Sequence, residues 1–238
     1  PEGTPLKKYT DGILKSSMKS AAIIQDLLTL ARRGVAVSEI VNLSKTVRDY
    51  LRTPEFEKLQ SHHPHVHIYT DLAENLLPIK GSPVHLGKTI MNLVSNAAEA
   101  ISDRGEVWIK TESRHLDRPI REYDEIQEGD YVVITVSDTG LGISASDRDK
   151  IFEPFYTKKT MGRSGTGLGL AVVWGTVKDH QGYIDVQSEE SKGSTFTLYF
   201  PATKETAVTI TKAQSLATYR GKGESILVVD DVSEQREL

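Results

Sequence analysis

The stretch VVITVSDTGLGIS, residues 132–144, joins an apolar, β-branched run to a carboxylate and then to two glycines. Such a run predicts a strand, and Asp138 lies at its end. A carboxylate there can leave the sheet and accept a hydrogen bond from an amino group, while Gly140 and Gly142 let the backbone turn and keep side chains away from a flat ligand such as adenine. A tight Asp-Thr-Gly turn without a ligand is the alternative.

Strands and helices are interleaved irregularly around this stretch. Alternating or β-branched residues between turn formers predict further strands at 66–70, 106–111, 183–187 and 195–200, and apolar periodicity predicts helices at 44–51, 83–101 and 168–180. Only a polar segment joins the strand at 106–111 to the one at 131–137, which predicts a long hairpin. We therefore expect an α+β fold in which a mostly antiparallel or mixed sheet carries helices on one face.

The two ends of the chain differ from this middle. Apolar residues recur at three-to-four spacing from about Pro5 to Arg33, which predicts one long helix. Its apolar stripe is expected to meet a partner helix, in preference to the core of its own chain. Residues 202–223 have the composition of a linker, and the apolar run before Asp230 and Asp231 predicts the first strand of a further domain. The expected divisions are 1–36, 37–201, 202–223 and 224–238.

Composition excludes several classes of protein. The 238 residues carry a formal net charge of -4 and include no cysteine, so disulfides and thiolate metal sites are excluded and broad attraction to nucleic acid is disfavoured. No run reaches the roughly 18 apolar residues that span a bilayer, and the first residues lack a signal-peptide stretch. We expect a soluble chain that contacts neither nucleic acid nor membrane.

Three further motifs suit a nucleotide. Asn92 and Asn96 lie one helical turn apart, and an amide oxygen is a suitable Mg²⁺ ligand, although ordinary capping or surface hydrogen bonds are the alternative. The glycines in GRSGTGLGL, 162–170, open a predicted helix and can hold phosphate oxygens, without the spacing of a P-loop or dinucleotide motif. FEPFYTKK, 152–159, predicts a lid with cations that face phosphates, or else a surface loop pinned by its aromatics.

In this order and spacing the motifs resemble the N, G1, F and G2 boxes of the sensor histidine kinase catalytic domain, which belongs to the GHKL ATPase superfamily. The matching stretches are NLVSNA (92–97), DTGLGI (138–143), FEPFYT (152–157) and GTGLGL (165–170), and GSTFTLYFP (193–201) is similar to the final strand of that family. The resemblance covers about residues 37–201. It implies the Bergerat-type ATP-binding fold, a two-layer α/β sandwich, preceded here by one long helix.

The resemblance also implies roles for the matching residues. Asn96 would coordinate the Mg²⁺ that bridges the ATP phosphates, with Asn92 as its helical neighbour and Lys159 as the lid cation. Asp138 would bind the adenine amino group. Further contacts to the base or the phosphates are implied for Gly140, Gly142, Thr157, Gly165, Thr166, Gly167, Leu168 and Gly169.

The implied activity is that of a protein histidine kinase in a two-component system. Related ATPases that hydrolyse ATP directly carry a water-activating Glu one turn before the magnesium Asn, whereas this chain has Asn92. Because an amide cannot take a proton, transfer of the γ-phosphoryl group to a side chain is favoured over rapid hydrolysis. A non-catalytic nucleotide-binding scaffold and another ATPase of the superfamily, such as a chaperone or topoisomerase domain, are the alternatives.

The accepting histidine is expected upstream of this chain. LLTLARRG, 27–34, resembles the end of the second helix of the family's dimerisation and phosphoacceptor domain, and none of the seven histidines has the context of an acceptor. Those histidines are His62, His63, His65, His67, His85, His115 and His180. The cluster HHPHVH, 62–67, is interpreted as a solvated loop at a helix-to-strand junction in preference to a metal site.

ILVVDD, 226–231, resembles the first strand and acidic pair of a receiver domain. The implied parent is therefore a cytoplasmic hybrid kinase, with a membrane anchor left open, that dimerises and exchanges phosphoryl groups with its own phosphoacceptor and receiver domains. Its implied ligands are ATP and Mg²⁺.

Overall fold

The computed structural model describes residues 5–31, 39–121, 123–158 and 166–205. The chain divides into two compact units, Pro1–Ala207 and Val208–Leu238. The second unit, which includes the predicted receiver strand, lies outside the described residues, as do most of the predicted linker, Lys159 and Gly165.

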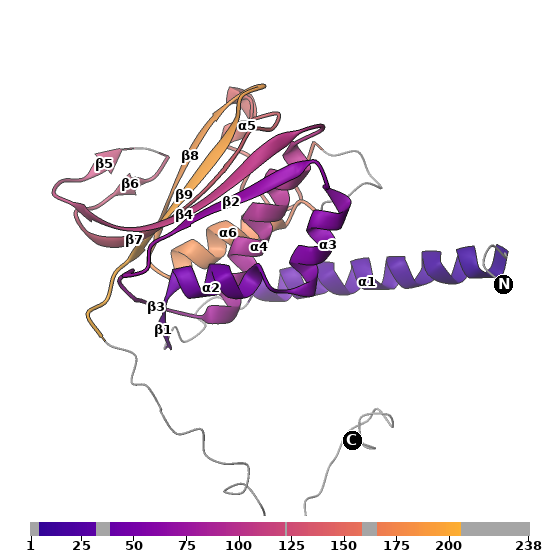
Figure 1. Ribbon diagram of the computed structural model, residues 1–238, viewed down its shortest axis with the longest axis horizontal. Coiled ribbons are helices and arrows are strands. Elements are labelled where there is room, and N and C mark those ends of the chain that lie inside the picture. Colours follow the sequence, from indigo (N-terminus) through magenta and orange to yellow (C-terminus); the bar gives the residue numbers. More distant parts are fainter. Residues whose placement is uncertain (1–4, 32–38, 122, 159–165, 206–238) are drawn as a thin grey trace, which may run out of the picture. The chain divides into compact units, whose positions relative to one another are not determined.

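A five-stranded sheet forms the centre of the first unit. Its strands, in spatial order, are β2 (Val66–Leu72), β4 (Gly105–Leu116), β7 (Gly129–Asp138), β9 (Gly193–Pro201) and β8 (Tyr183–Glu189). β2 and β4 run parallel, and the other neighbours run antiparallel. The helices α2 (Leu43–Tyr50), α4 (Pro83–Ala100) and α6 (Gly169–Asp179) lie on one face of this sheet (Figure 1). The predicted α+β class and mixed sheet are confirmed.

Shorter elements complete the unit. They are β1 (Glu39–Val41), which pairs with β3 (Ile79–Gly81), then α3 (Pro54–His62), α5 (Ala145–Arg148), and β5 (Ile120–Arg121), which pairs with β6 (Glu125–Ile126). The β5–β6 hairpin lies within the long connection between β4 and β7. The predicted hairpin of β4 and β7 is confirmed by ten antiparallel residue pairs from Val107↔Asp138 to Leu116↔Gly129.

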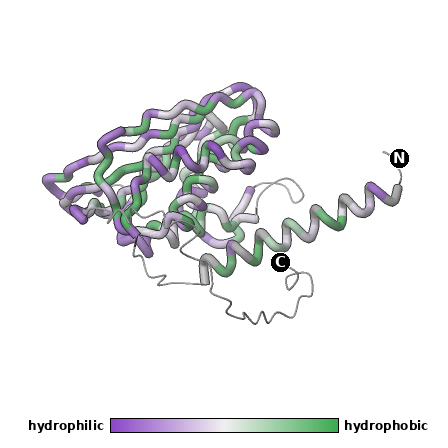
Figure 2. The backbone as a smooth tube through the Cα atoms, turned by 60° about the horizontal axis from the view of Figure 1, so that its bottom comes forward, coloured by the Kyte–Doolittle hydropathy of each residue, from purple (hydrophilic) through white to green (hydrophobic). Residues whose placement is uncertain are grey.

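The main core lies between the sheet and the helices because strand residues point alternately to its two faces. On β4, Val107 and Ile109 are fully buried, whereas Trp108 between them is half exposed. Hydrophobic and hydrophilic residues alternate along the strands in Figure 2. α4 supplies the largest helical share of this core through Leu86, Ile90, Leu93, Val94 and Ala97. The site elements described below are therefore held on a rigid two-layer frame.

A second, smaller cluster lies on the opposite face of the sheet. It contains Leu116, Ile126, Tyr131, Val133 and Tyr199. Tyr131 and Val133 alternate along β7 with Val132 and Ile134 of the main core, so they point to the other side. Since Ile126 belongs to β6, the β5–β6 hairpin covers this end of the outer face.

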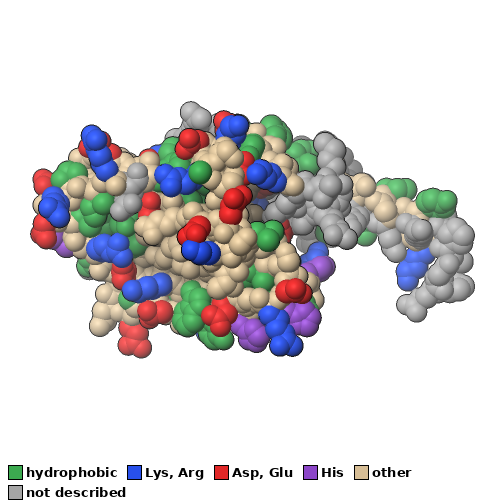
Figure 3. All heavy atoms as spheres, turned by 90° about the horizontal axis from the view of Figure 1, so that it is seen from above, with side chains coloured by type: hydrophobic (Ala, Val, Ile, Leu, Met, Phe, Trp, Pro, Cys, Tyr) green, Lys and Arg blue, Asp and Glu red, His purple; other side chains and the backbone are tan. Residues whose placement is uncertain are grey.

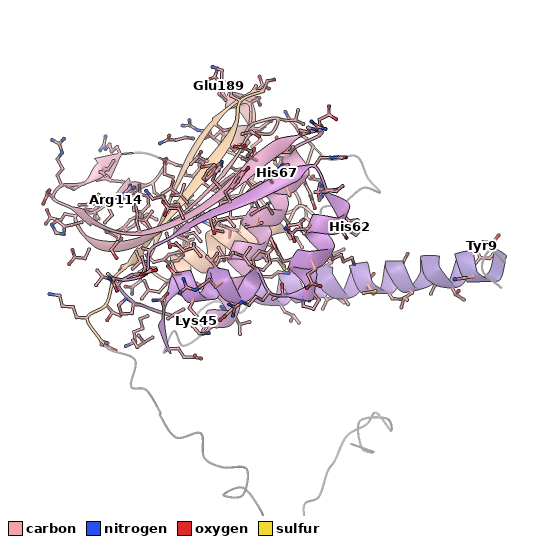
Figure 4. All side chains as sticks on the ribbon, in the orientation of Figure 1. Tyr9, Lys45, His62, His67, Arg114 and Glu189 are labelled. Carbon is pink, nitrogen blue, oxygen red and sulfur yellow. The ribbon has the colours of Figure 1, made fainter. Side chains whose placement is uncertain are left out.

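The predicted long helix is α1 (Pro5–Ala31). Several of its large apolar side chains are exposed, among them Ile13, Leu14, Met18 and Tyr9, the last of which is labelled in Figure 4. An exposed apolar stripe of this kind fits a helix that packs on a partner helix, which stays a prediction.

Charged groups of both signs are interspersed over the face shown in Figure 3, in keeping with the small net charge. Among the helices that the structure describes, none is long and apolar enough to cross a membrane.

Candidate nucleotide site

Helix α4 forms the base of the candidate site. Ser82 caps it by accepting a hydrogen bond from the backbone N–H of His85, and Pro83 occupies its first turn, where no amide donor is needed. Asn92, Asn96 and Ala100 follow at intervals of four residues, so they lie along one side of the helix. From Asn92 to Ala100 the axis rises about 12 Å.

Asn92 connects α4 to the start of α6. Its side chain is buried, and Nδ2 donates a hydrogen bond to the carbonyl oxygen of Gly169 at 3.1 Å. Among the described residues its Oδ1 has no hydrogen-bond donor. The helix that carries the N box and the start of α6 therefore meet at this residue.

The other end of α4 meets the glycine turn that follows β7. The backbone N–H of Leu141 donates to the carbonyl oxygen of Ala100 at 3.0 Å. A Cβ on Gly140 would lie 2.6 Å from the same oxygen, which is too close for any side chain. Gly140 is therefore required because any side chain would collide with the end of α4. The sequence suggested a different reason, namely that the glycine leaves space for a flat base.

Asp138 ends β7 beside this turn. Its Oδ1 accepts a hydrogen bond from the backbone N–H of Gly140 at 2.8 Å. Burial raises the pKa of the Asp138 carboxyl group, and hydrogen bonds from the backbone N–H groups of Gly140 and Ser194 act in the opposite direction. Because a carboxylate has about four acceptor positions, two backbone donors leave room for the amino group of a ligand.

The start of α6 is free of a side-chain cap. Leu168 occupies the N-cap position without a side-chain hydrogen bond to the helix, and its own backbone N–H donates to Thr166 Oγ1 at 3.2 Å. The first-turn N–H groups are therefore available to an anion, which the helix dipole also favours.

Gly167 holds this loop against the F box. The backbone N–H of Phe155 donates to the Gly167 carbonyl oxygen at 2.9 Å. Gly167 has φ +70°, and a Cβ there would lie 2.5 Å from the Phe155 carbonyl carbon. Phe155 itself has φ 68°, an uncommon conformation for a residue with a side chain. The two segments are thus joined by direct backbone contact.

The predicted site residues therefore fall into three groups. Asn92 touches the start of α6, the turn at Gly140 touches the end of α4, and Asn96 lies on α4 between these two contacts. Asn96 is half-buried, and its carboxamide makes no hydrogen bond within the described part of the chain. A ligand with a base at one end and phosphates at the other fits this order along the helix.

Comparison with known proteins agrees with this arrangement. Residues 81–204 match the model of the family described as histidine kinase-, DNA gyrase B- and HSP90-like ATPase. The chain belongs to this family. The matched range contains all four motifs that resemble the boxes of the sensor histidine kinase catalytic domain.

Relatives of this chain include a sensor kinase and a signal transduction histidine-protein kinase. Sensor kinase CckA of Brucella abortus is 33% identical over 190 residues, which cover 79% of this chain and 20% of the relative. AtoS of Escherichia coli, a signal transduction histidine-protein kinase, is 33% identical over 195 residues, which cover 82% of this chain and 29% of that protein. The chain thus spans about a fifth to three tenths of the length of these relatives.

A solved structure shows the same fold. Full-length ShkA in complex with AMPPNP superimposes with a TM-score of 0.65 at 24% identity, and the match covers 84% of this chain and 40% of that chain. The catalytic domain of histidine kinase ThkA superimposes with a TM-score of 0.54 at 25% identity, over 68% of this chain and 94% of that chain. The mixed sheet with helices is therefore the fold of a histidine kinase catalytic domain.

Asp147 organises the F box in this member of the family. Its carboxylate accepts hydrogen bonds from Tyr156 OH at 2.6 Å and Ser144 Oγ at 2.5 Å, and it forms an ion pair with Lys158. The Lys158 contact, followed by those of Ser144 and Tyr156, lowers the pKa of Asp147. Lys158 is therefore engaged by protein. Thr157 beside it is exposed and also has an interaction of its own.

Several of these contacts are not apparent from the motifs. Asp147, Ser188 and Ser194 lie outside the four boxes. Asp147 bonds the nearby Tyr156, whereas Ser188 accepts from the Ile143 N–H and the Ser194 N–H bonds Asp138, both far away in sequence. The turn residues in SEESKGS, 188–194, are a signal of a tight turn that could have pointed to Ser188 and Ser194.

A separate hollow of about 370 Å³ lies beside α6. Phe152, Trp174, Lys178 and His85 are among its lining residues, and none of the predicted nucleotide residues is. The aromatic rings of Phe152 and Trp174 lie 5.0 Å apart. This hollow is distinct from the candidate nucleotide site.

Proposed function

We propose that this chain binds ATP along α4 and that, in the whole protein, it transfers the γ-phosphoryl group to a histidine outside the chain. The observation that carries the proposal is the position of α4. Its Asn92 contacts Gly169 at the start of α6, and its Ala100 contacts Leu141 in the glycine turn. One helix therefore brings the carboxylate end and the amide end of the site within reach of one nucleotide.

In this proposal Asp138 accepts a hydrogen bond from the adenine amino group. The backbone N–H groups of Gly167 and Gly169 donate to the phosphates, because the start of α6 has no side-chain cap, whereas the Leu168 N–H donates to Thr166 Oγ1. Thr157, Thr166, Lys159 and Gly165 are proposed as further contacts to the phosphates, and Gly140 and Gly142 as the wall of the base pocket. AMPPNP in the complex of ShkA, which shares the fold, supports a nucleotide here.

The donor set also fits Mg²⁺. Asn96 offers an amide oxygen without a hydrogen-bond partner in the described segments, and Asn92 Oδ1 is similarly free. Mg²⁺ prefers oxygen ligands and usually retains water and substrate phosphates in its shell. We propose Asn96 as the ligand; a bound Mg²⁺ would neutralise charge that develops on the phosphates.

The residues favour transfer over hydrolysis. Asn92 cannot accept a proton, and its Nδ2 is already bonded to the Gly169 carbonyl oxygen. In the proposed reaction the bond between the γ-phosphorus and the bridging oxygen of ATP breaks, and a phosphorus–nitrogen bond forms on the unprotonated nitrogen of the imidazole. ADP leaves, and the proton on the other ring nitrogen passes to solvent. The chain contributes position and hydrogen bonds rather than a general base at Asn92.

The wider assignment is also a proposal. Residues 1–36 would end a dimerisation and phosphoacceptor domain, 37–201 would form the catalytic domain, 202–223 a linker, and 224–238 the start of a receiver domain. The parent would be a cytoplasmic, dimeric hybrid kinase in a two-component phosphorelay. The curated relatives, which are sensor kinases, support this proposal.

The test is transfer from labelled ATP to a separately supplied phosphoacceptor hairpin domain. With the unsubstituted 238-residue chain we expect Mg²⁺-dependent label on the histidine of that hairpin. With the Asn96→Ala variant we expect no label. If the unsubstituted chain binds ATP but labels no acceptor, a nucleotide-binding signalling scaffold is the correct function. Rapid release of phosphate that Asn92→Ala abolishes would instead identify a hydrolysing ATPase.

A further inference from the structure

The hairpin turn between β8 and β9 packs directly on the glycine turn at 139–143. Gly142 has φ +68°, and a Cβ on it would lie 2.0 Å from the carbonyl oxygen of Glu189, which Figure 4 labels at the end of β8. The backbone N–H of Ser191 donates to the Leu141 carbonyl oxygen at 2.7 Å. A Cβ on Gly193 would lie 1.9 Å from the Asp138 carbonyl oxygen. The two turns therefore meet backbone to backbone.

Ser188 joins these two turns through its side chain. Its Oγ accepts a hydrogen bond from the backbone N–H of Ile143 at 2.7 Å and donates one to the Gly193 carbonyl oxygen at 2.9 Å. The Ser194 hydroxyl lies 3.0 Å from the same Oγ. Because Ser188 has one proton and gives it to Gly193, Ser194 is the donor in that third contact. The Ser188 hydroxyl is therefore fixed in one orientation.

Besides the hydrogen bonds of Thr139 with Glu106 and of Leu141 with Ser191, three contacts hold the glycine turn. The Asp138 carboxylate binds the N–H of Gly140, the Ala100 carbonyl binds the N–H of Leu141, and the Ser188 hydroxyl binds the N–H of Ile143. The first contact comes from the proposed base-binding residue itself, and the second comes from main chain. The hydrogen bond to Ser188 can thus be removed by a single substitution that leaves the proposed nucleotide-binding groups unchanged.

We infer that Ser188 is a positioning residue of the base site, whose hydroxyl keeps the glycine turn in the conformation that receives adenine. This inference rests on the proposed function. Without the hydroxyl, the turn would have to become ordered when the base binds, and that loss of conformational entropy would weaken affinity. This loss of affinity concerns the adenine base, which ADP and ATP share, so it should be equal for the two nucleotides.

Isothermal titration of the 238-residue chain with ADP, and with ATP, tests this role. We expect Ser188→Ala to raise both Kd values by the same factor, about tenfold, which corresponds to one hydrogen bond. The number of sites per folded chain should stay the same. Ser188→Thr keeps the hydroxyl and should bind within about twofold of the parent.

Ser44→Ala is the matched control. Ser44 is a buried serine on α2 whose Oγ bonds the Ala73 carbonyl oxygen and Thr111 Oγ1, both at 2.8 Å and neither in the candidate site. Its substitution should lower the melting temperature and leave both Kd values unchanged.

Three results would overturn the positioning role while the parent still binds: an unchanged Kd in Ser188→Ala, an equal loss in Ser44→Ala, or a loss for ATP without one for ADP. Absence of binding by the parent chain would instead contradict the proposed function.

Discussion

The carboxamide of Asn92 donates a hydrogen bond to the carbonyl oxygen of Gly169, 3.1 Å away, and thereby fixes the start of α6 against the middle of α4. Removal of this buried side chain in Asn92→Ala leaves the Gly169 carbonyl without that donor. Such losses destabilise a fold by about 1–3 kcal/mol. We expect a lower free energy of unfolding in urea together with weaker ATP binding. Unaltered stability would show that the hydrogen bond does not hold the two helices together.

Asp138→Asn should weaken ATP binding while the fold persists. The asparagine oxygen can still accept the hydrogen bond from Gly140, but its amino group cannot accept one from adenine. Because hydrogen bonds to charged groups contribute about 1.5–3 kcal/mol, we expect Kd to rise at least tenfold. Calorimetry measures the affinity, and the melting temperature serves as the control. Equal affinity in parent and variant would remove Asp138 from the base site.

Asn96→Ala should abolish the effect of Mg²⁺ on nucleotide affinity. The parent is expected to bind ATP more tightly with Mg²⁺ than with EDTA, since Asn96 offers an amide oxygen to the ion. Asn75→Ala, at an exposed loop position, is the control and should keep the difference. If Asn96→Ala still responds to Mg²⁺ like the parent, the ligand is another residue.

Gly142→Ala should destabilise the fold, whereas Gly87→Ala should not. At Gly142 the backbone is left-handed and the new Cβ would meet the Glu189 carbonyl, so we expect a loss of more than about 1 kcal/mol. Gly87 lies within α4, and its nearest non-local atom would be 4.0 Å from the Cβ, so alanine should be neutral or stabilise by about 0.5–1 kcal/mol. Urea titration of both variants compares the two. A tolerated Gly142→Ala would show that the two turns can separate.

His180 should make the fold sensitive to acid. It is buried, its Nε2 accepts from the Ser82 N–H at 3.0 Å, and its Nδ1 lies 2.7 Å from the Thr176 carbonyl oxygen, so the neutral ring fits both partners. Burial is the largest cause that lowers the pKa of His180, and nearby His85 acts in the same direction. The hydrogen bond to the Thr176 carbonyl oxygen and, to a smaller extent, Asp179 act in the opposite direction. The unfolded chain therefore binds this proton more readily, and stability is full above pH 6.5, the ordinary value, and falls as the pH decreases toward the lower folded pKa.

Melting curves between pH 8 and pH 5 check that dependence. We expect His180→Gln to be less stable than the parent at pH 8 but to lose less stability on acidification. His67→Gln, at an exposed position, is the control. A parent and a His180→Gln variant with parallel pH profiles would exclude His180 as the source of the acid sensitivity.

The strands of this fold are predictable because their patterns are local. Along β4 the buried residues Val107 and Ile109 alternate with exposed ones, and that period of two is visible without any structure. α3 is not predictable in this way, because PEFEKLQSH buries Phe56 alone and lacks an apolar stripe. Its start is instead defined by Thr53, whose side chain accepts from the Phe56 N–H.

The candidate site is predictable where residue type alone suggests the chemistry, as for Asp138 and Asn96. The reasons for the glycines cannot be predicted from the sequence. Gly140 and Gly142 are required because a Cβ would collide with backbone atoms of Ala100 and Glu189, which are about 40 residues or more away in sequence. Ser188 was missed for the same reason. A serine near a turn has no distinctive pattern until the fold places Ile143 beside it.

The central claim is that one nucleotide contacts the glycine turn, α4 and the start of α6 together. Backbone amide chemical shifts, followed by NMR during titration with AMPPNP and Mg²⁺, test it most directly. We predict that the signals of Gly140, Asn96 and Gly169 move in parallel and fit a single Kd. If only one of these groups responds, or if the groups fit different dissociation constants, the single nucleotide site is contradicted.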